Sequence, residues 1–489
     1  MADIIQVLTD VFTPINEWVW YVAFVFLIGL GLYFTYRLKF MQILKVDETS
    51  KLALTNINAD DDKEKVSSFE AFCIGMGARI GVGNIAGVAN AILLGGPGAV
   101  FWMWIFAIIG SASSFMESVL AQLYKEKKED GGYHGGPAYY ASKGLKSRKL
   151  GVAIALLTIL AFGIGFVGVQ ATNCAAALSN AFQFEGNKYV FATIIAIAAA
   201  IIFFGGVKKI GKFSAKVVPL MALGWFIFAL VVICMNFSMV PNAIEMIFDY
   251  AFSGPAILGG GIGVVIMNGL KRGVFSNEAG LGSVANIAST ANVKHPAKQG
   301  MIQSFGVLVD TLVVCSITAF VILSAFDSFE MLKDASKAWG EMVNGKWVNA
   351  AGSVFVQNVL ALSIGDVAKY ILAIFILVFA FTSMVGYYTM SESNMRFIKD
   401  DEKLINVVRV VIIIVAFASC LIDVLLMELI SDTFMAAMGA VNMCVVLLLS
   451  PKAIAVYKDW RKQKNEGIEE PVFHKDILGD DTDGITEWD

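Results

Sequence analysis

The chain of 489 residues is poor in histidine, proline and charge, with three His, nine Pro and 16% charged residues. The histidines are far apart, and no HExxH or GxSxG motif stands at the end of an apolar run, so a membrane-embedded enzyme has little support. The six cysteines lie within apolar stretches and form no CxxC pair, which indicates buried spacers rather than metal or redox centres. The net charge of −4 gives no indication of a nucleic-acid partner.

Hydrophobic residues are abundant instead. They make up 57% of the chain, a proportion typical of an all-α polytopic membrane protein and not of a soluble enzyme. Eleven apolar runs of roughly 20 residues are long enough to cross a bilayer as helices. These predicted spans are 17–37, 69–95, 97–124, 150–180, 188–206, 215–238, 255–283, 300–326, 367–392, 405–425 and 432–450.

Lysine and arginine collect in alternate loops between these spans, as they do when basic loops stay on the cytoplasmic side. The basic segments are 37–66, 125–149, 207–216, 284–299, 393–404 and the tail after 450. Segment 327–366 also contains lysines, but long loops are translocated largely regardless of charge. The pattern predicts a multi-pass protein with its N-terminus outside and its C-terminus in the cytoplasm.

The ten spans after the first divide into two sets of five that enter the membrane from opposite sides. Each set opens with a glycine-interrupted segment, Gly75 to Gly87 in one and Gly259 to Gly282 in the other. Interrupted helices at matching positions of two inverted halves point to the binding site of a transporter. The expected parts are an N-terminal span with a cytosolic amphipathic linker, two five-helix repeats and a cytosolic acidic tail, at 1–68, 69–238, 255–450 and 451–489.

Two segments outside the spans have their own composition. From Leu38 to Leu54, apolar residues at roughly helical spacing alternate with lysines, which fits either a helix along the inner membrane surface or a solvated linker. The tail from Asn465 to Asp489 is acidic and almost without apolar periodicity, so we expect it to be poorly ordered.

The first interruption, within Gly77 to Ala89, holds four glycines, an arginine and an asparagine. In lipid, broken backbone survives only inside protein or around a cavity, so the freed groups are candidate ligands. The first amides of the new half-helix carry the positive end of its dipole and suit a carboxylate, while the carbonyls before the break suit a hard cation. A glycine-rich packing face is the alternative. The amide side is Gly81, Val82, Gly83 and Asn84, and the carbonyl side is Gly77, Ala78 and Ile80.

The second interruption, from Asn268 to Ser283, contains Lys271, Arg272 and Glu278. Charges inside a membrane are normally paired or face water. We expect Arg272 to pair with Glu278, and Arg79 to pair with Glu117. These four charges are interpreted as structural or gating groups rather than as substrate ligands.

Further polar residues stand in the middle of other spans. Gln170, in 150–180, could bond an amino acid or a neighbouring helix. The adjacent hydroxyls of Thr382 and Ser383 offer oxygen ligands to a hard monovalent cation such as Na+. Asp310 could serve a cation or proton site, but a bond to a neighbouring side chain is the favoured interpretation.

Four runs of the sequence closely resemble the alanine or glycine:cation symporter family. They are GVGNIAGVA at Gly81–Ala89, GGPGAVFWMW at Gly95–Trp104, GGPAYY at Gly135–Tyr140 and RGVFSNEAG at Arg272–Gly280. The resemblance covers most of the chain. It implies the LeuT-type fold, with five plus five inverted helices and one extra span in front, and Na+-coupled uptake of small neutral amino acids across a prokaryotic plasma membrane.

The resemblance also implies roles for individual residues. The amides of Val82 and Gly83 match the group that binds the substrate carboxylate, and Gln170 matches a substrate ligand of the third core helix. The wall of the pocket matches Phe275, Ser276 and Asn277. The sodium site between the first and eighth core helices matches Gly77, Ile80, Thr382 and Ser383.

Two positions depart from the family pattern. Gly386-Tyr387 stands where Gly-Trp is common, and Asn268 where tyrosine is frequent. The resemblance implies alanine or glycine as the substrate, but both changes could reshape the pocket, so serine and glutamine remain open.

Three other functions are weighed against Na+ symport. H+-coupled symport would use the same architecture. A channel would line its path with similar residues, but a selectivity filter normally comes as a symmetric ring of chains. An enzyme would need catalytic motifs, and the sequence has no HExxH or GxSxG at the end of a span. No organic cofactor and no obligate protein partner is implied; the expected partners are an amino acid, Na+ and the lipid bilayer.

Overall fold

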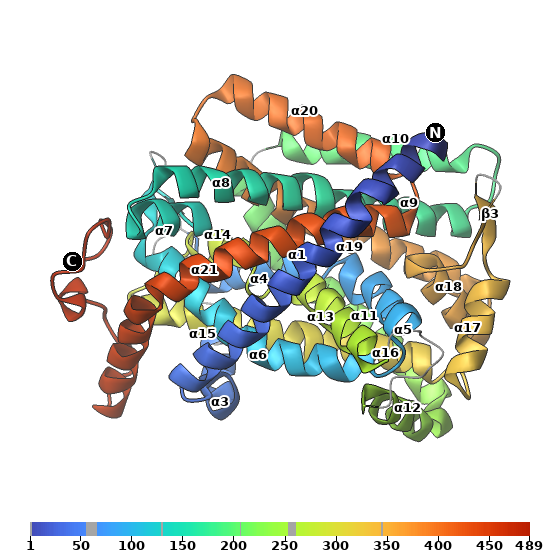
Figure 1. The fold of residues 1–489 in the computed structure, drawn as a ribbon, viewed down its shortest axis with the longest axis horizontal. Helices are drawn as coiled ribbons and strands as arrows, with labels where there is room; N and C mark the ends of the chain where they lie inside the picture. The colour runs from blue at the N-terminus through green and yellow to red at the C-terminus, as the bar shows by residue number, and fades with distance from the viewer. Residues whose placement is uncertain (1, 55–65, 129–130, 206, 253–260, 344–345) are drawn as a thin grey trace.

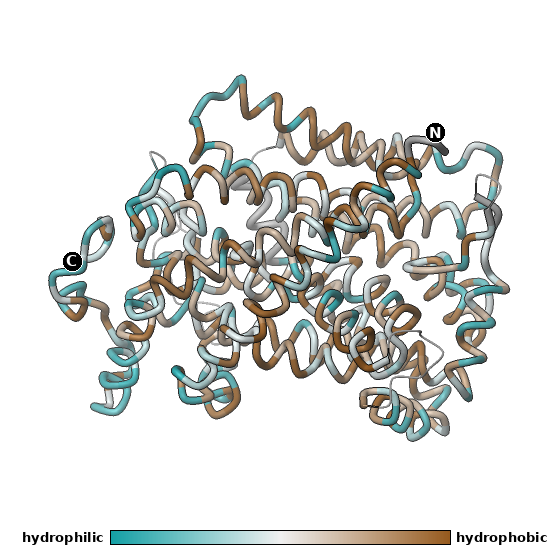
Figure 2. The backbone as a smooth tube through the Cα atoms, viewed as in Figure 1, coloured by the Kyte–Doolittle hydropathy of each residue, from teal (hydrophilic) through white to brown (hydrophobic). Residues whose placement is uncertain are grey.

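The computed structural model describes residues 2–54, 66–128, 131–205, 207–252, 261–343 and 346–489. The chain is almost entirely helical, and its long helices run side by side across the molecule (Figure 1). Hydrophilic residues gather at two opposite ends, and hydrophobic residues occupy the band between them (Figure 2). This distribution is that of a protein crossing a bilayer along its helices.

The first half of the chain contains the N-terminal helix, a short linker and the first group of membrane helices. Its helices are α1 (Ala2–Arg37), α2 (Met41–Leu44), α3 (Val46–Leu54), α4 (Ser68–Arg79), η2 (Val82–Asn84), α5 (Ala86–Gly95), α6 (Ala99–Leu123), α7 (Pro137–Gly144), α8 (Arg148–Thr158), η3 (Ile159–Phe166), α9 (Val167–Ala181), α10 (Asn187–Phe203), α11 (Val207–Met235), η4 (Phe237–Met239) and α12 (Val240–Phe252). An antiparallel pair of two-residue strands, β1 (Glu126–Lys127) and β2 (Tyr133–His134), follows α6.

The second half repeats the pattern of a broken helix followed by long helices. Its helices are α13 (Ile262–Asn277), α14 (Ser283–Ala288), α15 (Pro296–Leu308), η6 (Val309–Cys315), α16 (Ser316–Leu323), α17 (Phe329–Ala338), α18 (Gly352–Ile364), α19 (Val367–Ile398), α20 (Glu402–Ser419), α21 (Val424–Asn465) and η7 (Lys475–Leu478). The strands β3 (Glu341–Val343) and β4 (Lys346–Val348) form a second antiparallel pair. Gly259, where the second interruption was expected to begin, lies outside the described residues.

Both expected interruptions occur, at positions set by local chemistry. A capping box of Ser67 and Glu70 starts α4, which ends at Arg79 before the short turn η2 and the half-helix α5. In the second half, α13 ends at Asn277, and the chain passes through left-handed backbone at Glu278, Gly280 and Gly282 before α14. Left-handed backbone is unstrained only for glycine, so the two glycines let the chain leave and re-enter a helix within five residues.

Two stretches of wider, π-type helical turn interrupt other helices: η3 between α8 and α9, and η6 between α15 and α16. Such turns shift the direction of the side chains that follow and occur often at functional sites. Nothing in the apolar periodicity predicts them.

Seven helices in the described residues are long and apolar enough to cross a membrane: Ile5–Arg37, Ala99–Leu123, Arg148–Ala181, Lys216–Met235, Pro296–Leu323, Val367–Ile398 and Val424–Asn465. The halves of the two broken helices are too short to enter this number, and so are α10 and α18. The chain is therefore an all-helical polytopic membrane protein, and the number of eleven spans stays a prediction.

The segment 327–366, expected to be a long loop, instead contains α17, the β3–β4 pair and α18. These elements lie together at one end of the molecule, opposite the C-terminus (Figure 1). The helix α18 packs on α5, α9 and α19. Its first residues bond the core: the Gly352 amide donates to Asn90 Oδ1 at 2.8 Å, and Ser353 Oγ donates to the Asn173 carbonyl at 2.9 Å.

The linker after α1 is docked rather than solvated. Its helix α3 packs on α15, and Glu48 accepts bonds from Trp460 Nε1 at 3.1 Å and Arg461 Nη1 at 2.7 Å, both from α21. Residues 55–65 lie outside the described residues.

The expectation of a poorly ordered tail is wrong. Trp488 is buried, and its indole donates to the Gln122 carbonyl at 2.9 Å, while Lys125 stands 4.7 Å from the centre of the same ring. Phe473 packs against Trp488, and Asp483 pairs with Lys146 at 2.7 Å. A few anchoring side chains at irregular spacing hold the tail, so it has no periodicity by which a sequence could reveal its order.

Candidate functional site

Asn84 links the first interruption to its surroundings. Its Oδ1 accepts from the Gly81 amide at 2.9 Å, and its Nδ2 donates to Asp310 Oδ1 at 2.6 Å and to Ser276 Oγ at 2.9 Å. Asn84 was expected to bind substrate, whereas here its amide ties the first break to the second break and to η6. The favoured interpretation of Asp310 fits its geometry, because both of its carboxylate oxygens accept bonds from neighbouring side chains.

Gly81 is the point where the break meets α9 and α19. The next amide, that of Val82, donates to Gln170 Oε1 of α9 at 3.1 Å. A Cβ atom on Gly81 would overlap Ser383 Oγ of α19 and would lie 3.1 Å from Gln170 Nε2. Glycine at position 81 is therefore required for this close approach.

The α19 residues contact the carbonyls at the end of α4. Ser383 Oγ donates to the Gly77 carbonyl at 3.1 Å, and the Tyr387 hydroxyl donates to the Ala78 carbonyl at 2.9 Å. The Thr382 hydroxyl donates instead to its own helix, to the Phe379 carbonyl at 3.0 Å. Of the four predicted sodium ligands, Gly77 and Ser383 thus touch directly, while Thr382 stands beside Ser383 in sequence and Ile80 caps the end of α4.

Aromatic rings form a wall beside Gly83. The rings of Phe275 and Phe166 stack 4.5 Å apart at an angle of 12°, and Tyr387 packs against Phe166 at 5.2 Å. A Cβ atom on Gly83 would lie 3.0 Å from the Phe275 ring. Phe275 and Tyr387 were expected here, but Phe166 and its neighbour Phe162 were missed because the π-type turn η3 aims them at this wall.

One amide at the break has no partner. The amides of Gly81, Val82, Asn84 and Ile85 all donate hydrogen bonds, whereas none is found for the Gly83 amide within the described part of the chain. A buried donor without an acceptor is costly, and a ligand oxygen would remove that cost.

The second interruption is held by groups from α6, α21 and η6. Glu117 Oε2 accepts from the Gly282 amide at 2.9 Å and from Asn442 Nδ2 at 3.0 Å. Asn442 also donates to the Gly280 carbonyl at 2.9 Å. At the start of the break, Asn277 Nδ2 donates to Thr311 Oγ1 at 3.0 Å.

The expected ion pair between Arg79 and Glu117 is wrong. The Arg79 guanidinium donates to the Asn277 carbonyl at 2.9 Å, the Gln303 carbonyl at 3.0 Å and Ser114 Oγ at 3.0 Å. All three acceptors are neutral. Arg79 therefore joins the end of α4 to the end of α13, to α15 and to α6.

The expected pair between Arg272 and Glu278 is also wrong. Arg272 bonds two acids of α21, Glu428 through Nη1 at 3.1 Å and Asp432 through Nη2. Asn90 of α5 donates to the other oxygen of Glu428 at 2.7 Å. Neither acid was predicted as a partner of Arg272, because Glu428 lies between two predicted spans and Asp432 is the first residue of the next one. The signal in the sequence is that the two acids stand four residues apart, one helical turn, at the start of an apolar run.

Glu278 is left without its expected partner. Its side chain is buried, its backbone is left-handed, and neither carboxylate oxygen has a hydrogen-bond partner among the described residues. Ser283, Arg79 and Tyr387 lie close enough to interact with it electrostatically. A buried carboxyl without a bonded partner is a candidate position for a proton or a cation.

The chemistry of this centre is that of binding rather than bond breaking. It presents amides, carbonyls, hydroxyls and an aromatic wall at two broken helices. No group of three or more His, Cys, Asp or Glu that could hold a metal ion occurs within the described ranges. Hydroxyl and carbonyl oxygens are ligands for hard cations, and free helix amides suit carboxylates.

Comparison with known proteins gives a consistent result. Residues 5–475 match the model of the sodium:alanine symporter family. The chain is 41% identical to the "Probable sodium/glutamine symporter GlnT" of Bacillus subtilis, over 99% of this chain and 96% of that protein. It is also 41% identical to the "Amino-acid carrier protein AlsT" of the same organism, over 95% and 94% of the two chains.

A likeness in fold extends to a more distant protein. The crystal structure of MhsT in complex with L-phenylalanine superposes with a TM-score of 0.53, covering 81% of this chain and 99% of that one, at 12% sequence identity. The arrangement of helices is therefore LeuT-like.

Replacing Gly81 by alanine tests the close approach at the first break. The added methyl would push on Ser383 and Gln170, and overpacking of this kind costs about 1 to 3 kcal/mol. We expect Gly81→Ala to lower the thermal unfolding temperature of the purified protein. Gly87→Ala is the matched control, because its Cβ would meet only the Phe275 ring at 4.0 Å. Equal unfolding temperatures for the two variants would contradict the packing described here.

Proposed function

This chain belongs to the sodium:alanine symporter family, a family of transporters rather than enzymes, and we propose that it takes up a small neutral amino acid together with Na+ by alternating access. The observation that carries the proposal is the first broken helix, whose backbone groups contact Gln170 and Ser383 beside an aromatic wall that the second broken helix helps to form. The protein would act in the plasma membrane of a prokaryote, with the N-terminus outside and the C-terminus in the cytoplasm.

The amino acid would bind at the amide side of the first break. Its carboxylate would accept from the Gly83 amide, which lacks a partner in the protein, and Gln170 would contribute its amide beside Gly81 and Val82. The side chain of the substrate would lie against Phe275, Ser276, Asn277 and Tyr387. Alanine and glycine are the first candidates, and serine and glutamine remain open; the similarity to GlnT supports testing glutamine early.

Na+ would bind at the carbonyl side of the same break. The carbonyls of Gly77 and Ile80 and the hydroxyls of Thr382 and Ser383 would supply oxygen ligands between α4 and α19. The contact of Ser383 with the Gly77 carbonyl supports this position, because it brings two oxygens together. If the Ser383 hydroxyl turned its proton away, both oxygens could coordinate a cation between them.

Coupling to one Na+ per amino acid supplies enough free energy to accumulate the amino acid against its concentration gradient. A tenfold Na+ gradient contributes about 1.4 kcal/mol and a potential of about 100 mV adds about 2.3 kcal/mol per charge. Together they support accumulation of roughly 500-fold. A channel could not accumulate its substrate in this way.

Counterflow in proteoliposomes tests the function directly. Vesicles loaded with unlabelled alanine, glycine, serine or glutamine should take up the same labelled amino acid, and an inward Na+ gradient should drive net uptake. The uptake should saturate and distinguish L from D isomers, which separates a carrier from a pore. Failure of all four amino acids to exchange, or uptake indifferent to Na+, would overturn the proposal.

Removing the Ser383 hydroxyl tests the sodium assignment. We expect Ser383→Ala to raise the Na+ concentration for half-maximal uptake at least tenfold, about the worth of one lost charge-assisted bond, with little change in the order of preferred amino acids. Thr382→Ser keeps a hydroxyl and serves as the control. A change of selectivity with unaltered Na+ dependence would contradict the assignment.

Proton coupling is a second candidate, favoured by the buried and unbonded carboxyl of Glu278. If this group carries a proton during transport, Glu278→Gln should keep binding and exchange but abolish the dependence of uptake on an inward pH gradient. Glu126→Gln, in the β1 strand outside the membrane helices, is the control. A wild-type protein whose uptake ignores the pH gradient would remove this candidate.

A further inference from the structure

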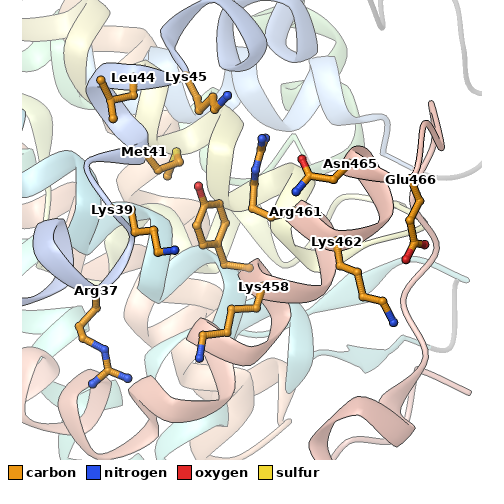
Figure 3. Close-up of a pocket in the computed structure, with 11 residues that line it drawn as sticks. Arg37, Lys39, Met41, Leu44, Lys45, Lys458, Arg461, Lys462, Asn465 and Glu466 are labelled. Carbon is orange, nitrogen blue, oxygen red and sulfur yellow. The ribbon is translucent and has the colours of Figure 1, made fainter.

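A cavity of about 700 Å³ lies between the end of α1, the helix α2 and the last turns of α21. It is separate from the broken helices. Its lining is strongly basic, with six lysines or arginines and a single acid: Arg37, Lys39, Met41, Leu44, Lys45, Tyr457, Lys458, Arg461, Lys462, Asn465 and Glu466 (Figure 3).

Most of this positive charge is not neutralised by the protein. Arg461 pairs with Glu48 at 2.7 Å. The ammonium groups of Lys39, Lys45, Lys458 and Lys462 form no ion pair or hydrogen bond with any described residue. Placing like charges around one cavity is unfavourable, so the cavity attracts an anion.

The turn that presents Lys39 is strained. Lys39 and Phe40 have φ values of 55° and 56°, in the left-handed region that favours glycine. The Phe40 amide donates to the Thr35 carbonyl and the Lys39 amide to the Tyr36 carbonyl, the hydrogen-bond pattern of a helix end that usually has glycine at the position of Lys39. A lysine kept at a position where glycine would relieve strain indicates a role for its side chain.

Exposed apolar side chains lie in the same turn of chain as the cavity residues Lys39 and Leu44. Leu44, which lines the cavity, is 69% exposed, and Phe40 and Ile43 are 47% and 49% exposed. Exposed apolar groups beside a cationic cavity at the end of a membrane helix match a ligand with an anionic head and hydrocarbon tails.

We propose that this cavity binds the phosphate-bearing headgroup of an anionic phospholipid, with Lys39, Lys458 and Lys462 around the phosphate and the acyl chains against Phe40 and Leu44. The volume is that of a small-molecule site. A soluble phosphate shares the headgroup chemistry but would leave the apolar rim without a partner. The site does not depend on which amino acid or ion is carried.

Native mass spectrometry of the purified protein with phosphatidylglycerol or phosphatidylcholine tests the proposal. The wild type should retain phosphatidylglycerol in preference to phosphatidylcholine. The double variant Lys39→Gly, Lys458→Gln should weaken phosphatidylglycerol binding about 25-fold, at about fivefold per lysine. Glycine at position 39 removes the charge and keeps the left-handed turn, so the variant is expected to fold.

The control is Lys149→Gln, Lys403→Gln, which removes two exposed lysines outside the cavity and should bind phosphatidylglycerol like the wild type. Equal affinity of the wild type for the two lipids would overturn the proposal without any variant. Unchanged binding by the cavity variant would overturn it as well. Competition by millimolar inorganic phosphate that displaces the lipid fully would show a site for free phosphate instead. None of these measurements requires transport, so they are independent of the proposed function.

Discussion

The two breaks depend on the hydrogen bonds of the buried Arg79 guanidinium. Arg79 ends α4 and is buried. Its guanidinium bonds Asn277 at the end of α13, Gln303 of α15 and Ser114 of α6. A buried cation is tolerable only when its donors are satisfied, so losing any of these contacts would leave an expensive charge. Gly306 is part of the same constraint, since a Cβ there would lie 2.5 Å from Arg79 Nη1. The breaks are therefore fixed to each other and to the surrounding helices.

The side chains that bond the backbone of the first break are neutral, and charged groups stand around it. Toward the α18 end, Arg272 bonds Glu428 and Asp432 and so ties α13 to α21. Toward the other end, Arg79 and Glu117 hold the breaks through neutral partners. A centre of amides, hydroxyls and aromatic rings suits a zwitterion with a hard cation. The buried carboxyls beside it are those of Asp310, which is bonded to Asn84 and Ser276, and of Glu278. Any separation of α13 from α21 would have to replace these bonds of Arg272 with water.

The breaks could be predicted from sequence because a cluster of glycines in an apolar run is a local property, and the family motifs lie on the same residues. The partners of the charged side chains could not be predicted in this way. Arg272 meets Glu428 across 156 positions, in a stretch that hydropathy assigns to a loop. The π-type turns that aim Phe166 at the wall and place Asp310 beside Asn84 have no compositional signature. The order of the tail depends on Trp488 and Phe473, which form no periodic pattern. The partners of Arg272 and the anchoring of the tail are contacts made at a distance from the local sequence, which a local pattern does not reveal.

The helix α21 connects these features along its 42 residues. Its first turns hold the acids that bond Arg272, its middle supplies Asn442 to the second break, and its last turns line the basic cavity. The N-terminal helix α1 packs along it and supplies the other side of that cavity. A ligand influences a conformational equilibrium only by the difference in its affinity for the two states. A lipid that bridges α1 and α21 would therefore act on transport only if these helices change their relative position. Arg272 and Asn442 both tie α21 to the second broken helix, so such a movement would reach the site through their bonds.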